Sequence, residues 1–252
     1  NPKAESKVRQ GVTTEIVGHC GFSVAPALAG KVELLRDYLS PSAPWTPFRE
    51  LSFPDYLDTF PATSVNAGML VGHNTLRLMV MGMADRAPSR AELDTMIDLL
   101  EQGLRAGALG MSSGLFTPPG SYAQPEEMHA FGRVLKQYNA AYFTHLRDES
   151  NNVLEAVQEA IRLAIDCEVH VEIVHFKCSG TDTSSTLAPS AIEECLRFES
   201  PVGMTTRVLH ADAVFEGRTL AKDTPLWLSI WSSNRDPARF RVAVIDGTKA
   251  NL

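Results

Sequence analysis

The amino-acid sequence predicts an α/β fold, a parallel (β/α) TIM-like barrel. Helical patterns separate apolar runs of strand length, which lie at residues 12–18, 65–71, 108–112, 140–145 and 169–175. Strands that alternate with helices are typical of a barrel or of a doubly wound sheet. The nucleotide-binding motifs GxGxxG and GxxxxGKS/T are absent from the sequence, which favours the barrel.

The composition is that of an ordinary globular protein. The chain has 252 residues, 44% of them apolar and 21% charged, with a formal net charge of −7. The acidic balance argues against a nucleic-acid partner. No apolar run reaches the roughly 18 residues of a membrane span, so a membrane partner is not expected. The four widely spaced cysteines form no CxxC pair, which indicates a cytoplasmic protein without a disulfide framework.

The first predicted strand ends in a turn at Cys20, between Gly18 and Gly21. Glycine lets the backbone bend closely around the cysteine, so its thiol is a candidate metal ligand. A lone cysteine is more often a small buried apolar residue, and this explanation stays open.

A long excursion follows at residues 25–51, with a short predicted helix at 31–38. An excursion of this length in a compact domain is usually a lid or a pocket wall. The strand at 65–71 then runs into His73, another histidine at a strand end. Local hydrogen bonding and a catalytic role explain that histidine equally well.

The middle of the chain supplies two candidate substrate contacts. Ser89 and Glu92 form a capping box that begins an amphipathic helix. The strand at 108–112 then delivers Ser113 to a loop, and a rigid turn ending at Tyr122 can shape the rim of a pocket. We therefore include Ser113 and Tyr122 among the candidate substrate-binding residues.

A strand–helix–strand unit organises the rest of the chain. The strands at 140–145 and 169–175 end on His145 and His175, and a helical pattern at 151–166 joins them. In a parallel (β/α) barrel, reactive groups gather at the carboxyl ends of the strands. We therefore expect the two imidazoles to converge on one metal ion.

Cys20 stands at a third strand end and completes a set of three donors. Thiolate and neutral imidazole both suit Zn²⁺, and three protein ligands with one open position suit a hydrolytic zinc site. Lys177 is expected to face the same side as His175 and to bind a substrate carboxylate, although a solvated surface lysine explains it equally well. Arg147 is a further candidate for substrate binding or for orienting the imidazoles. Asp148 and Glu149 could also orient the imidazoles, but a solvated, charged helix start explains these two residues more simply.

The pattern loosens after residue 180. A helix is expected at 190–198 and a sixth strand at 202–208, and a last strand-like run at 240–247 contains Asp246. We predict a (β/α)-barrel core at residues 1–210 and a divergent tail at 211–252.

Five segments of the sequence occur in the order found in the N-acyl-D-amino-acid deacylases, or D-aminoacylases. They are GVTTEIVGHCGFS (11–23), VGHNTLR (71–77), GALGMSSGL (107–115), THLRDE (144–149) and HFKC (175–178). The chain resembles this family, which belongs to the amidohydrolase superfamily of metal-dependent (β/α) barrels. The resemblance implies a barrel of the metal-dependent hydrolase type. It also implies zinc-dependent hydrolysis of the amide bond of N-acyl-D-amino acids, a small-molecule substrate class, to a carboxylate and a D-amino acid.

The resemblance also implies roles for single residues. Position by position, it makes Cys20, His145 and His175 the zinc ligands and Lys177 a contact to the substrate's carboxylate. The family's catalytic aspartate has its nearest counterpart in Asp246.

Some family features have no counterpart in the sequence. No His-x-His pair precedes Gly11, and His19 stands where the family usually has asparagine. We therefore expect an incomplete barrel, truncated or altered at both ends. Two alternatives stay open: a catalytically silent homologue that retains a metal site, and a cyclic-amide hydrolase similar to hydantoinase or dihydroorotase.

Overall fold

The computed structural model describes residues 2–177, 204–208, 212–215, 218–222 and 225–229. Contacts within the chain divide it into two compact units, Asn1–Ser179 and Gly180–Leu252. The domain boundary expected between residues 210 and 211 stays a prediction, because it falls among residues outside the described ones. Across the described part of the chain, no helix is both long and apolar enough to span a membrane.

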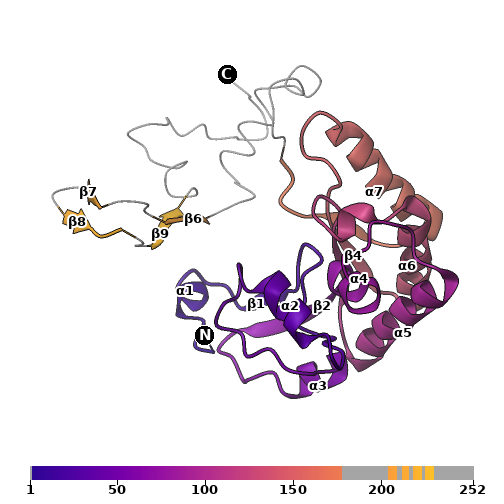
Figure 1. Ribbon diagram of the computed structural model, residues 1–252, viewed down its shortest axis with the longest axis horizontal. Helices are drawn as coiled ribbons and strands as arrows, with labels where there is room; N and C mark the ends of the chain where they lie inside the picture. The colour runs from indigo at the N-terminus through magenta and orange to yellow at the C-terminus, as the bar shows by residue number, and fades with distance from the viewer. Residues whose placement is uncertain (1, 178–203, 209–211, 216–217, 223–224, 230–252) are drawn as a thin grey trace. The chain divides into compact units, whose positions relative to one another are not determined.

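The first unit is built on a five-stranded sheet in the order β1-β2-β3-β4-β5 (Figure 1). The strands are β1 Thr14–Val17, β2 Asn66–Gly72, β3 Gly110–Gly114, β4 Ala141–His145 and β5 Val171–Ile173. Every neighbouring pair is parallel. Spatial order follows sequence order throughout, as in a barrel wall, whereas the strand order of a doubly wound sheet reverses at a switch point. The predicted (β/α) barrel is confirmed as an incomplete barrel.

Helices connect the successive strands. They are α2 Val32–Leu39 and α3 Phe53–Asp58 after β1, α4 His73–Met81 and α5 Arg90–Ala106 after β2, α6 Pro125–Gln137 after β3, and α7 Val153–Cys167 after β4. The short helix α1 Glu5–Val8 precedes β1, and the 3-10 helix η1 Gly120–Tyr122 precedes α6. Helices α5, α6 and α7 lie side by side along the sheet (Figure 1).

Local sequence signals set the helix boundaries. The predicted capping box is present at the start of α5: the Glu92 N–H donates to Ser89 Oγ at 3.3 Å, and the Ser89 N–H donates to Glu92 Oε2 at 2.7 Å. Gly107 ends the same helix in the left-handed conformation, with φ 111°. Pro125 stands in the first turn of α6, where its missing N–H costs nothing. The helix predicted inside the excursion is α2.

The main hydrophobic core lies between the sheet and the helices that cover it. Met111 and Tyr142 of the strands belong to one cluster with Leu100 of α5 and Phe131 of α6, and none of the four is more than 2% exposed. Helix α4 is buried over its whole first part, from His73 to Met79. Its polar residues are buried together with its apolar ones, so its sequence lacks the division into an apolar and a solvated face that predicts an amphipathic helix.

The second unit contains two antiparallel strand pairs. β6 Met204–Val208 pairs with β9 Pro225–Ser229, and β7 Ala213–Phe215 pairs with β8 Arg218–Leu220. The strand predicted at 202–208 is therefore present as β6, but its predicted place as a sixth barrel strand is wrong, because its partner is the antiparallel β9. The helix expected at 190–198 and the strand expected at 240–247 lie outside the described residues.

Candidate metal centre

Three strand ends bring one thiol and two imidazoles together. Cys20 follows β1, His145 is the last residue of β4, and His175 follows β5. Their candidate ligating atoms all lie within 4.8 Å of one another. Cys20 Sγ is 3.2 Å from His175 Nε2, and the rings of His145 and His175 stand nearly perpendicular with their centroids 4.2 Å apart. Among the described residues, this is the one group of three such side chains close enough to hold a metal ion.

The turn that carries Cys20 has an unusual backbone conformation. Cys20 has φ 57° and lies between Gly18, with φ 91°, and Gly21, with φ 79°. A non-glycine residue in this region costs of order 1–3 kcal/mol, so neighbouring groups must hold the turn. The Ser112 hydroxyl does this by donating to the Gly18 carbonyl and accepting from the Gly21 N–H at 3.0 Å. The buried Asn74 fills the other side, where a Cβ on Gly21 would lie 2.1 Å from Asn74 Oδ1.

Burial governs the protonation of the three candidate ligands. It lowers the pKa of His145 to about 4, although the nearby Glu149 opposes this shift. Burial also lowers the pKa of His175, and the positive charge of Lys177 adds to the effect. Burial raises the pKa of the Cys20 thiol, while Lys177 acts in the opposite direction. At neutral pH both imidazoles are therefore neutral and keep a lone pair for a metal ion, and the thiol must release its proton when a metal binds.

Glu149 lies near this centre, and of the two explanations that the sequence left open for it, the structure does not support the favoured one. The residue is 7% exposed, and it is not the solvated helix start that the sequence suggested. Its Oε1 atom lies 3.2 Å from His145 Nε2 and 3.3 Å from His175 Nδ1. Its spacing from His145, four residues along a chain that turns back after β4, is the one signal that the sequence holds for it.

Lys177 lies beside the same carboxylate. Its Nζ atom contacts Glu149 Oε1 and lies 3.4 Å from His175 Nδ1. The lysine side chain is 29% exposed, whereas that of Glu149 is 9% exposed. The structure therefore places this cation at the edge of the centre, with one side toward Glu149 and another toward solvent.

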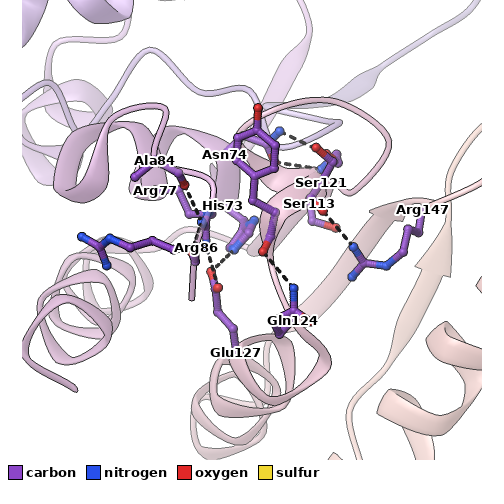
Figure 2. A network of polar contacts seen from close by, with 12 residues as sticks. His73, Asn74, Arg77, Ala84, Arg86, Ser113, Ser121, Gln124, Glu127 and Arg147 are labelled. Carbon is purple, nitrogen blue, oxygen red and sulfur yellow. Dashed lines mark hydrogen bonds and ion pairs between the residues drawn. The ribbon is translucent and has the colours of Figure 1, made fainter. Parts of the chain in front are cut away.

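Arg147 makes its contacts elsewhere. Its Nε and Nη2 atoms donate to the two carboxylate oxygens of Glu159 in α7 at 2.9 and 2.8 Å. Its Nη1 atom donates to the Ser121 carbonyl at 3.3 Å (Figure 2). A bidentate pair of this kind fixes geometry as well as charge. The guanidinium thus ties the segment after β4 to α7 and η1, and the substrate contact expected of Arg147 finds no support in this geometry.

Ser113 faces the other side of the sheet from the candidate ligands. The strand register pairs Ser113 with Thr144 and Gly114 with His145, and successive side chains of a strand point to opposite faces. The Ser113 hydroxyl accordingly lies 2.5 Å from the Tyr142 hydroxyl and 3.2 Å from Thr144 Oγ1, in a fully buried position. Its expected substrate contact finds no support here either.

Two further candidates stay predictions. Tyr122 is the last residue of η1 and is partly exposed, next to the Ser121 carbonyl that Arg147 binds. Asp246, the predicted catalytic residue, lies outside the described residues.

Figure 2 shows a second polar cluster, formed by His73, Arg77 and Glu127, which we call the buried triad. His73 Nε2 lies 2.8 Å from Glu127 Oε1, and Arg77 Nη1 donates to Glu127 Oε2 at 2.5 Å. None of the three side chains is more than 2% exposed, and the His73 ring packs edge-on against Phe131. Of the two explanations left open for His73, the structure supports local hydrogen bonding.

Comparison with known proteins finds deacylases whose sequences are similar to part of this chain. The D-aminoacylase of Alcaligenes xylosoxydans xylosoxydans is 39% identical over 176 residues, which make up 69% of this chain and 36% of that protein. The matched part of the chain is similar in sequence to the N-acyl-D-amino-acid deacylases. The N-acyl-D-aspartate deacylase of the same organism is 38% identical over 183 residues, 71% of this chain and 36% of its own length. The chain thus spans about a third of the length of these two deacylases.

Solved structures of deacylases share the fold. The N-acyl-D-glutamate deacylase from Bordetella bronchiseptica was crystallised with zinc and a phosphonate that mimics the tetrahedral intermediate of the reaction. It matches with a TM-score of 0.66 at 32% identity, over 83% of this chain and 46% of that chain. A D-aminoacylase crystal structure matches with a TM-score of 0.64 at 32% identity, over 80% of this chain and 44% of that one. These matches confirm the predicted resemblance to the deacylases and the amidohydrolase type of the barrel.

A cytochrome P450 family model matches residues 153–243, fewer than half of the chain. The matched range begins at Val153 in α7 and includes β5, both of which the structure builds into the parallel first unit. It continues through the two antiparallel strand pairs of the second unit. None of the sequence motifs described above predicts this similarity.

Proposed function

We propose that the chain carries the metal centre of a zinc-dependent amidohydrolase that cleaves the amide bond of N-acyl-D-amino acids to a carboxylate and a D-amino acid. The observation that carries this proposal is the convergence of Cys20, His145 and His175, whose ligating atoms lie within 4.8 Å of one another. One thiolate and two imidazoles form a donor set suited to zinc, and three protein ligands leave a coordination position open for catalysis. The deacylases that share this fold support the choice of substrate, because their names state that they act on N-acyl-D-amino acids.

The residues of the centre fit a zinc ion in their protonation as well as in their chemistry. His145 and His175 are neutral at pH 7 because burial lowers their pKa values, so neither needs to lose a proton before binding a metal. Cys20 does need to lose one, and the nearby Lys177 favours the thiolate. A bound zinc ion would polarise the substrate carbonyl and lower the pKa of a bound water to about 7.

Lys177 is the residue of this chain that we assign to the substrate's carboxylate. An ammonium group has three N–H donors, and the contact with Glu149 uses one of them. Because 29% of the side chain is exposed, the remaining donors can bind a carboxylate that approaches from solvent. Asp246, outside the described residues, keeps the predicted role of proton shuttle, and Tyr122 that of a pocket-rim residue. The wide spacing of the cysteines leads us to propose the cytoplasm as the place of action.

The first test is the zinc content of the purified full chain, measured by mass spectrometry for the wild type and for Cys20→Ala. We expect about one zinc ion per wild-type chain and almost none in the variant, because two imidazoles alone hold zinc poorly. Ser113→Ala is the matched control, since its hydroxyl lies on the other face of the sheet, and it should retain zinc. A folded wild-type protein that binds no zinc would overturn the proposal.

The second test is the substrate range of the zinc-loaded protein. We expect release of free D-amino acids from N-acetyl-D-amino acids and no release from the L-enantiomers. Hydrolysis of a hydantoin alone would identify a cyclic-amide hydrolase. Full zinc occupancy without turnover of either amide would identify a catalytically silent homologue.

A further inference from the structure

The carboxylate of Glu149 occupies a central position among the candidate ligands. A single oxygen, Oε1, faces His145 Nε2 at 3.2 Å, His175 Nδ1 at 3.3 Å and the Nζ atom of Lys177. The adjacent Asp148 differs: its carboxylate accepts hydrogen bonds from Ser150 and Asn152 in the segment that precedes α7. Two neighbouring acids therefore have separate surroundings, and Glu149 is the one that contacts the imidazoles.

The two nitrogens of His175 point toward different partners. Nε2 lies 3.2 Å from Cys20 Sγ, on the side where the metal would bind, and Nδ1 faces Glu149 and Lys177. A neutral imidazole carries one proton, on either nitrogen. If Nδ1 accepted a hydrogen bond from Lys177, the one hydrogen of the neutral His175 ring would sit on Nε2 and block the metal. A carboxylate can only accept, so Glu149 selects the tautomer with the hydrogen on Nδ1 and the lone pair on Nε2.

Lys177 completes the arrangement because it holds the carboxylate in position. Its ammonium contacts the same Oε1 atom that faces the two imidazoles, and the Glu149 side chain is 9% exposed. A nearly buried carboxylate in contact with a cation is held in one orientation, which a freely rotating surface side chain would not be. We call His175, Lys177 and Glu149 the open triad. In this triad the lysine holds the carboxylate in position, and the carboxylate orients the imidazole.

We propose that Glu149 is the positioning residue of the metal centre, which holds His175 in the tautomer that presents Nε2 to the metal. This inference rests on the proposed zinc site, and it concerns the contact between Glu149 and His175. It also assigns Lys177 a part in the centre itself in addition to its contact with the substrate.

The first experiment measures zinc affinity of the full chain in competition with a chromophoric chelator. Glu149→Gln keeps the size of the side chain and removes its charge, and we expect zinc to bind about 10–100-fold more weakly, as is typical when the partner of a ligating histidine is changed. Asp148→Asn is the matched control, because it makes the same chemical change one residue earlier at a carboxylate that contacts Ser150 and Asn152. Its zinc affinity should equal that of the wild type. Equal affinities for the wild type and Glu149→Gln would overturn the proposal.

The second experiment examines His175 in the metal-free protein. Nitrogen-15 chemical shifts of labelled histidine distinguish the two tautomers, with His175→Gln used to assign the signals. We expect the Nδ1–H form of His175 in the wild type and in Asp148→Asn, and a shift toward the Nε2–H form in Glu149→Gln. An unchanged tautomer would overturn the positioning role even if zinc affinity fell. If the wild type bound no zinc, only the proposed function would be overturned. The tautomer of His175 would still test the positioning role of Glu149.

Discussion

The buried triad and the open triad contain the same three kinds of group: an imidazole, a carboxylate and a cation. In the buried triad the side chains of His73, Arg77 and Glu127 are at most 2% exposed. In the open triad the side chains of His175, Lys177 and Glu149 are 19%, 29% and 9% exposed. The same chemistry therefore occurs in two environments of one unit, and the environment decides what each cluster can do.

The two triads also differ in the partners of their polar atoms. Each oxygen of Glu127 has its own partner, and Arg77 Nη2 also donates to the backbone carbonyls of Ala84 and Arg86. Such a cluster holds α4 and α6 together. In the open triad, by contrast, His175 directs its second nitrogen at the thiol of Cys20. A lone pair that faces a second metal donor, near solvent, identifies a candidate site better than the residue types do.

The largest difference between the triads should appear in stability. Glu127→Gln removes the charge that neutralises Arg77, whose side chain is fully buried. Breaking a buried pair by changing one partner costs about 3–5 kcal/mol. We expect the free energy of unfolding, measured by urea titration of the full metal-free chain, to fall by that amount.

The matching change in the open triad is Glu149→Gln. Because Lys177 and His175 are partly exposed, water can replace the lost carboxylate, and we expect the free energy of unfolding to fall by no more than about 1 kcal/mol. Equal losses in the two variants would show that exposure does not separate the triads, and the comparison would fail.

A smaller effect should separate the two serines of β3. Ser112→Ala leaves the Gly21 N–H and the Gly18 carbonyl without this partner, and Ser113→Ala removes a bond to the buried Tyr142 hydroxyl. Each should lower the free energy of unfolding by about 1–3 kcal/mol. Only Ser112→Ala should also weaken zinc binding, by about tenfold, because it frees the turn of Cys20. If Ser113→Ala weakened zinc binding and Ser112→Ala did not, the face of the sheet that we assign to the metal centre would be wrong.

Acid should affect the buried triad through Glu127. Burial raises the pKa of this carboxyl, but the hydrogen bonds and charges of His73 and Arg77 outweigh burial and lower it below its ordinary value of 4.5. A carboxyl whose pKa is lower in the folded state contributes stability above its unfolded pKa and loses it as pH falls through the folded pKa. The gap in unfolding free energy between wild type and Glu127→Gln should therefore be constant above about pH 6 and shrink below about pH 4.5. A gap that does not change between these values would mean that Glu127 is not ionised in the triad.

The sequence predicted those parts of the centre that depend on local pattern. His145 and His175 stand at the ends of recognisable strands, and the carboxyl ends of parallel strands meet at one edge, so their convergence followed from the alternation of strands and helices. Cys20 was marked by its flanking glycines. The sequence likewise predicted strand β6. It did not predict that β6 pairs with β9, because strand pairing is decided by contacts distant in sequence.

The parts of the centre that the sequence left undecided depend on tertiary contacts. Glu149 follows a strand and precedes a helix, which locally resembles a solvated turn, and its burial results from residues 26 and more positions away that return to the same place. Ser112 and Ser113 look alike in the sequence, and the register of β3 against β4 decides which one faces Cys20. The burial of Glu149 and that register both require the assembled sheet.

The smallest expected effect distinguishes the two cations. Lys177→Met removes an ammonium that is 29% exposed, and the carboxylate it contacts keeps both imidazoles as neighbours. We expect the free energy of unfolding to change by less than about 1 kcal/mol, because partly exposed ion pairs contribute little. Zinc should still bind, since the three candidate ligands remain. The same change at Arg77, whose side chain is fully buried, should cost several kilocalories per mole because it leaves the Glu127 carboxylate without its cation. If instead Lys177→Met destabilised the protein as much as Arg77→Met, the open triad would be a structural ion cluster like the buried one, and the distinction by exposure would be lost.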